Sequence, residues 1–516
     1  MLGVMPLPSL LLTGVRLVPL GTPTAAGPAS IGGDTPTRVR ITDGQVTEVG
    51  PGLTSRGEPV VDAEGAWAMP GLWDQHVHAL QAGADRERLD LSGAASAPAA
   101  AALVEAHAAS LADPTSLISA SGYRSVTWPR LGSVADLDAV SGRHPVIAIS
   151  ADCHNGWLNS AALQLLGLPQ RDGPIEEAEW FAVMGRLRDL PGVLEAGERG
   201  LRGLVTDLQA RGVVGIVDME HSAAYRDWPA RVGALPPFRV RASVYPESLA
   251  QAEAAGLRTG ATLAGPLATM GPLKIISDGS LNTRTAWCCE PYPAAHPDSP
   301  VTANPLGVRN YSREELLALA GRARAAGLHI ALHAIGDAAV AQALDVMLAT
   351  GVRGSIEHAQ LVRWQDVPRM AAVGVRASVQ PAHLLDDRDV TDLCWPTGAP
   401  RSFALRAMID AGVDVRLGSD APVAPPDPWL AMAAAVHRSA DERDPWHPEQ
   451  ALTVPEALAA STDGWGTIAP GHPGDVVLLQ EDPHGAPGEG SAQAAARLRA
   501  TRPLATIVAG RVVVSR

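Results

Sequence analysis

Cysteine and positive charge are both scarce in this sequence. Only 4 of the 516 residues are cysteine, and none forms a Cys-x-x-Cys pair, so we expect reduced thiols rather than a disulfide framework. Lys and Arg number 41 against 55 Asp and Glu, a formal net charge of −14, which argues against the basic face that a nucleic acid requires. Hydrophobic residues make up 46% of the chain, too many for a disordered protein.

The chain also lacks a long uninterrupted apolar run. Its first twenty residues are broken by Pro6, Pro8, Gly14 and Arg16 and have no basic segment before the apolar stretch. We therefore expect neither a membrane span nor a secretory signal. These absences predict a soluble, cytoplasmic protein that binds neither nucleic acid nor a membrane.

Short β segments occupy both ends of the sequence, whereas the middle alternates short apolar runs with Ala- and Leu-rich helical stretches. Such alternation is typical of βα units on a parallel sheet. Eight apolar runs end in polar residues; they cover 71–78, 213–219, 238–245, 272–279, 328–337, 354–360, 374–383 and 413–422. Eight units predict an α/β fold, a (β/α)8 TIM-like barrel with its polar groups at the carboxyl ends of the strands.

We expect two further parts beside this barrel, a small sandwich and an inserted cap. Residues 1–68 and 466–516 form one small β-sandwich from both termini, and residues 69–465 form the barrel. The stretch 79–212 is too long for a single βα connection, so we interpret it as an inserted cap over the barrel mouth.

The first candidate site residues are His76 and His78 in Asp-Gln-His-Val-His. Side chains at i and i+2 share one face of a strand, so both imidazoles can point toward the barrel mouth. Two neutral imidazoles on one face provide half of a divalent metal site. The pair alone does not separate a metal site from two core or surface histidines.

Four further candidates fall on other predicted strands: Lys274, His333, His358 and Asp420. Each alone has a structural explanation, since His333 can be a hydrogen-bonded core histidine and Asp420 a helix cap. Their coincidence at one end of the same barrel favours a shared site.

Charge supplies a reason for a lysine inside this group. Two dications held only by imidazoles would form a poorly compensated positive centre. A lysine that has reacted with CO₂ is an anionic carbamate able to bridge two ions. Together with Asp420 and a hydroxide, the carbamate lowers the net charge of a two-ion centre to about +1.

This arrangement resembles the amidohydrolase superfamily, and more narrowly its YtcJ-like branch, the amidohydrolase family 3 proteins that include N-substituted formamide deformylases. The matching segments are PGLWDQHVHAL, LKIISDGSLNTRTAW, LHAIGDAAV, IEHAQ, SVQPAHLLDD and AGVDVRLGSDAPVAPPDPW, and they extend over nearly the full length. The chain departs from the branch in three places. It has Asp152-Cys153-His154 where Asp-Gly-His is usual, and Gly122-Tyr123-Arg124 in the insertion where a Gly-Trp-Asp-like element is usual. It also has Asp-Gly-Trp-Gly at 463–466 where an Ala run is usual.

The resemblance implies a centre of two divalent ions, zinc in the first instance. His76 and His78 would bind one ion, His333 and His358 the other, and Lys274 as its carbamate would bridge them. Asp420 would touch the first ion and shuttle a proton. For substrate contacts, positions near the strand ends predict His154, Asp278, Arg284, Gln380 and His383.

The implied activity is hydrolysis of a non-peptide C–N bond in a small-molecule amide, an N-formyl or N-acyl amine, by attack of a metal-activated hydroxide. A deaminase or a cyclic amidase of the same superfamily, with one metal or two, is an alternative, as is a barrel that binds small molecules without turnover. A homodimer is the expectation from the resemblance alone.

Overall fold

The computed structural model describes residues 8–21, 33–187, 189–190, 192–221, 223–293 and 304–516. Its centre is a sheet of eight parallel strands that closes into a barrel, and the strands coincide with the eight runs expected from the sequence. In barrel order they are β6 (Leu72–Val77), β12 (Val213–Asp218), β13 (Arg239–Val244), β15 (Ala268–Ile276), β16 (Ile330–Ala334), β17 (Gly354–His358), β18 (Arg376–Val379) and β19 (Asp414–Leu417). A short strand, β14 (Thr262–Ala264), pairs with β15 from outside.

The barrel closes between its first and last strands. The backbone N–H of Asp420 donates to the carbonyl of His76 at 2.7 Å, and that of His78 donates to Ala421 at 2.9 Å. Gly418 permits this approach, since a Cβ there would lie 2.9 Å from the backbone nitrogen of His76. Closure therefore brings the histidine pair of β6 directly beside Asp420.

Helices surround the barrel and bury its outer apolar face. In chain order they are α7 (Ala224–Arg231), α8 (Pro246–Ala254), α9 (Arg313–Ala326), α10 (Asp337–Thr350), α11 (Val367–Val373), α13 (Leu405–Asp410), α14 (Pro428–His437) and α15 (Val454–Ala460). The helix after β18, α12 (Leu384–Cys394), packs in smaller apolar clusters of its own. The sequence shows why α9 begins where it does, because Ser312 and Glu315 form a reciprocal capping box. The largest apolar cluster of the molecule lies between these helices and the strands.

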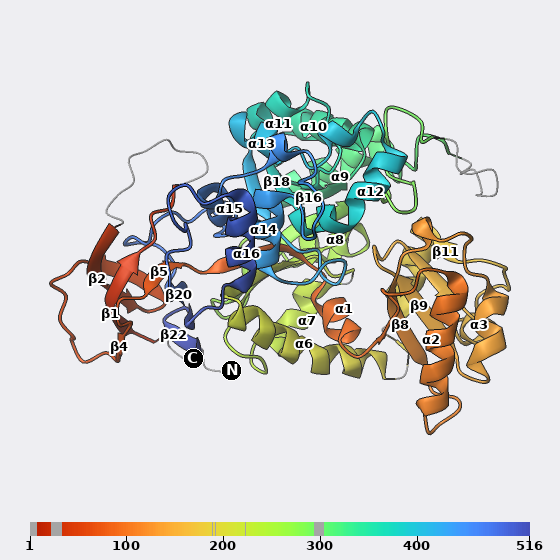
Figure 1. The fold of residues 1–516 in the computed structure, drawn as a ribbon, viewed down its shortest axis with the longest axis horizontal. Coiled ribbons are helices and arrows are strands. Elements are labelled where there is room, and N and C mark those ends of the chain that lie inside the picture. Colours follow the sequence, from red (N-terminus) through yellow and green to blue (C-terminus); the bar gives the residue numbers. More distant parts are fainter. Residues whose placement is uncertain (1–7, 22–32, 188, 191, 222, 294–303) are drawn as a thin grey trace.

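Strands from both ends of the chain share a second sheet, which lies to the left of the barrel in Figure 1. Its members are β1 (Leu10–Leu17), β2 (Gly33–Thr42), β3 (Gln45–Val49), β4 (Val60–Asp62), β5 (Trp67–Pro70), β20 (Val476–Leu479), β21 (Ala505–Val508) and β22 (Arg511–Ser515). Between β20 and β21 the chain forms the helix α16 (Ser491–Ala500), which packs on α14.

The inserted segment forms its own layered unit at the right of Figure 1. Five strands, in the order β11 (Ile175–Glu176), β10 (Asn155–Leu158), β9 (Val146–Ser150), β8 (Ile118–Tyr123) and β7 (Leu89–Asp90), form its sheet. The helices of this unit are α2 (Ala97–Ser110), α3 (Val134–Ser141), α4 (Ser160–Leu165) and α5 (Glu177–Leu187). The first and last helices of the inserted segment, α1 (Ala79–Asp85) and α6 (Val193–Ala210), pack instead against the barrel (Figure 1). The domain boundaries predicted from the sequence remain a proposal.

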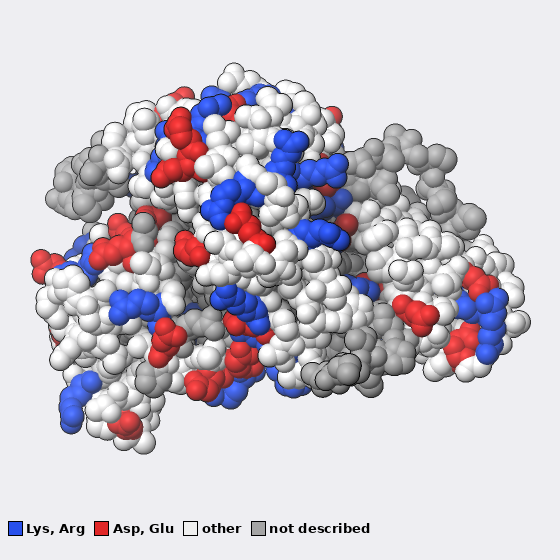
Figure 2. All heavy atoms as spheres, turned by 180° about the vertical axis from the view of Figure 1, so that it is seen from behind, with Lys and Arg blue, Asp and Glu red and all other residues white. Residues whose placement is uncertain are grey.

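Two properties of the surface accompany this fold. On the face drawn in Figure 2, acidic and basic side chains are interspersed and separated by wide uncharged areas. Among the described residues, no helix has the length and apolar character needed to cross a bilayer.

Candidate metal centre and substrate cavity

The six predicted ligands lie together at the carboxyl end of the barrel. Nε2 of His76 is 3.4 Å from Oδ1 of Asp420 and 3.1 Å from Nζ of Lys274, and Nε2 of His78 is 3.3 Å from the same Asp420 oxygen. The ring of His358 is 5.1 Å from that of His76 and 4.5 Å from that of His333. Residues from strands β6, β15, β16, β17 and the end of β19 thus converge on one point.

Two groups within this cluster have metal-ligand spacing. One contains His76, His78 and Asp420, and the other contains His358, His383 and Asp420. Asp420 belongs to both, which fits a carboxylate between two ions. His383, for which we expected a substrate contact, lies at ligand distance in the second group.

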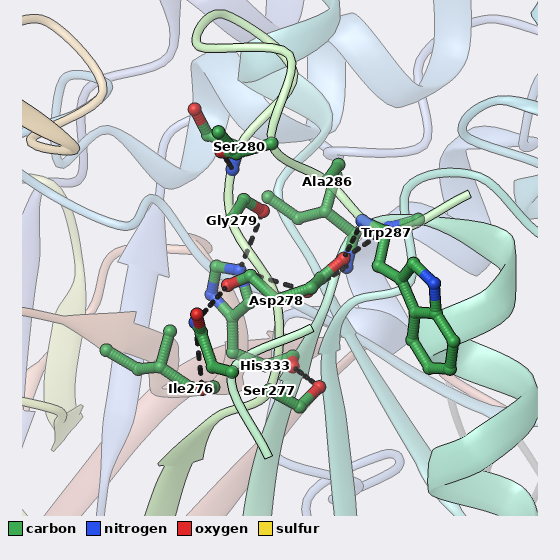
Figure 3. A network of polar contacts seen from close by, with 12 residues as sticks. Ile276, Ser277, Asp278, Gly279, Ser280, Ala286, Trp287 and His333 are labelled. Carbon is green, nitrogen blue, oxygen red and sulfur yellow. Dashed lines mark hydrogen bonds and ion pairs between the residues drawn. The ribbon is translucent and has the colours of Figure 1, made fainter. Parts of the chain in front are cut away.

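His333 takes a different position from the other three imidazoles. Its Nε2 lies 3.3 Å from the carbonyl of Gly279 and 3.4 Å from Oδ1 of Asp278 (Figure 3). An N–H donated to that carbonyl leaves the lone pair on Nδ1. His333 can therefore still act as a ligand through Nδ1.

Burial favours the neutral form of several nitrogens in this cluster, the form that offers a lone pair to a metal. Burial lowers the pKa of Lys274, and it lowers the pKa of His333 and His358 well below the usual value. Nδ1 of His78 and Nδ1 of His358 are buried and have no hydrogen-bond partner among the described residues. Imidazole nitrogens, an amine whose pKa is lowered and an ionised carboxylate form a donor set that suits divalent ions.

Asp420 is the ionised member. Burial alone would raise the pKa of its carboxyl group, but His76, His78 and His358 outweigh burial and hold the pKa well below the ordinary value. The backbone of Asp420 is left-handed, with φ of 58°, and that of His358 has φ of 70°. Such strained positions concentrate at functional sites because the surrounding structure must support them.

Two hollows meet above the cluster and share Asp152, His154, His333, His358, Asp420 and Val423. We call them the polar arm and the apolar arm; each encloses about 490 Å³ of empty space. The polar arm adds Arg124, Asn282, Gln360, Asp386 and Asp387, whereas the apolar arm adds Phe181, Met184, Tyr245 and the β6 histidines. Both arms lie between the inserted segment and the barrel.

His154 lies in the part common to both arms, with its ring 5.7 Å from that of His333. Burial by itself would lower the pKa of His154, but the Glu177 carboxylate, 3.1 Å from Nδ1, outweighs burial and raises the pKa to about 9. Hydroxyl donation from Thr283 at 2.8 Å helps to keep Glu177 ionised. An imidazolium therefore faces the cluster at neutral pH.

Three other expected substrate contacts lie elsewhere. Asp278 is fully buried and accepts hydrogen bonds from the backbone N–H groups of Trp287, Ile335 and Gly336 at 3.0, 3.1 and 2.9 Å (Figure 3). Gln380 is buried and donates to the carbonyl of Ser378, and Arg284 lies beside Cys394. None of these three described residues lines either arm.

Sequence reasoning missed the carboxylates that orient the site. Glu357 lies 2.7 Å from Nδ1 of His76, and Asp74 accepts from the backbone N–H of Ser419 at 2.8 Å. Strict strand alternation would separate Glu357 from its neighbour His358, but the left-handed backbone at His358 brings both side chains to the centre. An acidic residue adjacent to a predicted ligand was the available signal.

The sequence and the fold of this chain are similar to those of known hydrolases. Residues 59–514 match the model of the Amidohydrolase family, Amidohydro_3. The chain is 28% identical over 468 residues to the YtcJ amidohydrolase of Bacillus subtilis (strain 168), covering 82% of this chain and 85% of that protein. It is 24% identical over 508 residues to the N-substituted formamide deformylase of Arthrobacter pascens, covering 86% and 90%. Among solved structures, an uncharacterized metal-dependent hydrolase from Pyrococcus horikoshii OT3 superposes with a TM-score of 0.74 at 26% identity, over 93% of this chain and 98% of that one.

Proposed function

Because the chain belongs to the amidohydrolase family, we propose that it hydrolyses a non-peptide C–N bond, with N-formyl or N-acyl amines as the substrate class. The observation that carries the proposal is the position of Asp420, which both ligand groups share beneath a cavity with two arms. The name of the Arthrobacter relative supports this class of substrate.

The proposed centre contains two divalent ions, zinc in the first instance. His76, His78 and Asp420 hold one ion; His358 and His383 with Asp420, and His333 through Nδ1, hold the other. Ions bound there lower the pKa of water and polarise a carbonyl oxygen.

Lys274 is proposed to bridge the ions as a carbamate. It is the only lysine in the sequence, is 1% exposed, and lies in contact with His76. Burial lowers its pKa, so more of it is the neutral amine. The amine nitrogen forms a bond to the carbon of CO₂ and loses a proton, which gives the anionic carbamate.

The chain's own side chains then supply proton transfer and charge stabilisation. Asp420, ionised before the reaction, accepts the proton of the attacking water and passes it to the departing amine nitrogen. The His154 imidazolium faces the same space and donates a hydrogen bond to the substrate oxygen as negative charge develops there. The two arms suit an amide with an apolar group on one side and a hydrogen-bonding group on the other.

A substrate screen on zinc-loaded protein tests this function. We expect release of free amine from N-formyl or N-acyl amines, with little ammonia from aminated heterocycles and no opening of cyclic amides. Ammonia release or ring opening in place of these reactions would assign the chain to a deaminase or a cyclic amidase. Full metal occupancy without turnover on any of these classes would contradict enzymatic function.

A further inference from the structure

The opposite end of the barrel contains a second cavity that the proposed reaction does not use. We call it the rear cavity; it encloses about 1400 Å³ of empty space, the part open to solvent included. Its polar lining comes from the amino-terminal ends of several barrel strands and from the loops that precede them. These lining residues include Gln75, Arg241, His329, Arg353, Ser355, Glu357, Arg376, Ser378, Asp414 and Asp463. The interior of a TIM barrel is ordinarily filled by branched apolar side chains, so a polar hollow of this size requires an explanation.

The unusual Asp-Gly-Trp-Gly segment at 463–466 forms part of this cavity. Both carboxylate oxygens of Asp463 accept from Arg241, at 2.9 and 2.5 Å, and Oδ1 also accepts from Gln75 at 3.1 Å. Gly464 makes room for Arg416, whose Nη2 would be 2.5 Å from a Cβ at that position. The segment thus closes one side of the cavity, and Asp463 compensates the charge of Arg241.

Positive charge remains after the pairs are matched. Asp414 is shared by two guanidiniums, those of Arg376 at 3.3 Å and Arg416 at 2.7 Å. The exposed guanidinium of Arg353 has no hydrogen bond or ion pair to another described residue. The remaining carboxylate, Glu357, faces His76. Glu357 also accepts from the Ser355 hydroxyl. Four guanidiniums and three carboxylates therefore leave one positive charge beside the cavity, and Arg353 is the guanidinium with no partner among the described residues.

Arg353 and Arg376 line the same part of the rim. Ser355 and Arg376 are partners across strands β17 and β18, and Arg353 lies directly before β17, two residues ahead of Ser355. Partial burial, together with these two arginines, lowers the pKa of the neighbouring His329, as expected where the potential is positive.

A further donor lies deeper in the same cavity. Ser378 follows Arg376 by two residues on β18 and is 1% exposed. Its Oγ has no hydrogen-bond partner among the described residues, although buried hydroxyls are ordinarily satisfied. An acceptor brought into the cavity would satisfy it.

We propose that the rear cavity is a binding site for a small oxyanion, a carboxylate or phosphate group, held by Arg353 and Arg376 with the Ser378 hydroxyl as an additional donor. Guanidinium forks match the planar carboxylate and the phosphate oxygens. The site is separate from the metal centre, which occupies the other end of the barrel.

Calorimetric titration of the metal-loaded protein tests the proposal, with inorganic phosphate and succinate as probes and chloride fixing the ionic strength. We expect Arg353→Gln and Arg376→Gln each to weaken binding of at least one probe by about tenfold. Ser378→Ala should weaken it less, and the exposed Arg511→Gln on β22 should leave it unchanged. The probe that responds identifies the group that the site accepts.

Anions bound at the metal centre do not depend on Arg353 or Arg376, because these residues line only the rear cavity. Only the part of the binding that the arginine substitutions weaken therefore reports on the rear cavity. Absence of any binding that at least one of these substitutions weakens would overturn the proposal. Arg353 is exposed and has no partner to lose among the described residues, so Arg353→Gln provides a folded variant even if Arg376→Gln is unstable.

Discussion

Nδ1 of His76 lies 2.7 Å from Oε2 of Glu357, and each side chain is only 1% exposed. The carboxylate fixes the proton on Nδ1 and leaves the lone pair on Nε2, the atom nearest Lys274 and Asp420. The end of β17 thus supplies both a ligand, His358, and the group that orients a ligand on β6.

Glu357→Gln should therefore weaken metal binding. The amide is neutral and holds the His76 tautomer less firmly, so we expect a loss of about 10–100-fold in metal affinity. Competition with a fluorescent chelator measures the affinity, and the exposed Glu314→Gln on α9 is the matched control. Unchanged affinity in Glu357→Gln would show that His76 does not depend on this contact.

Asp420→Asn should separate binding from catalysis. An amide oxygen can still contact a cation but cannot accept a proton, so we expect turnover to fall by about 10²–10⁴-fold while most of the metal is kept. Metal analysis and steady-state kinetics on the same sample measure both, with the exposed Asp389→Asn as control. Activity close to that of the wild type would remove Asp420 from proton transfer.

His154 should titrate near pH 9 in the metal-free protein. Its folded pKa is raised above the ordinary 6.5, so the stability that it contributes is fully present below about pH 6.5 and is lost as the pH rises through about 9. Glu177→Gln should lower this pKa, because burial then acts without an opposing charge. Two-dimensional NMR of the His154 imidazole at a series of pH values measures this pKa in the wild type and in Glu177→Gln. The same pKa in each would contradict the role of Glu177.

Asp278→Ala should destabilise the fold. It removes the acceptor for three buried backbone N–H groups, at a cost of about 1–3 kcal/mol or more in the free energy of unfolding. Denaturant unfolding measures this, and the exposed Asp410→Asn is the control. A variant of unchanged stability and a raised KM would instead support the substrate contact expected from the sequence.

The barrel was predictable because each strand is a short apolar run bounded by polar residues, and all eight runs are barrel strands. Periodicity also explains the first candidate ligands, since His76 near the end of β6 and His78 just after it are two residues apart and both lie beside Asp420. The insertion was harder, because its short strands β7, β10 and β11 depend on partners within the unit rather than on their own pattern.

Where the prediction of the site failed, contacts between distant residues decided the outcome. Asp278 and Gln380 follow strand ends, as catalytic groups do, but Asp278 accepts from backbone amides and Gln380 donates to a backbone carbonyl. Glu177 acts on His154 from another element of the inserted segment, and no local pattern links the two. The sequence showed only that the segment containing Asp463 differs from the family pattern. Its position at the rear cavity, where Asp463 pairs with Arg241, became known from the structure.

The central claim is that Lys274 and the surrounding imidazoles hold two ions at one point. Because Lys274 is the only lysine, ¹³C NMR of protein loaded with zinc and ¹³C-bicarbonate, paired with metal analysis of the same sample, tests the claim directly. We predict a single protein carbamate signal and close to two ions per chain, with the signal absent from Lys274→Ala. No carbamate signal, together with one ion or none, would contradict the two-ion centre.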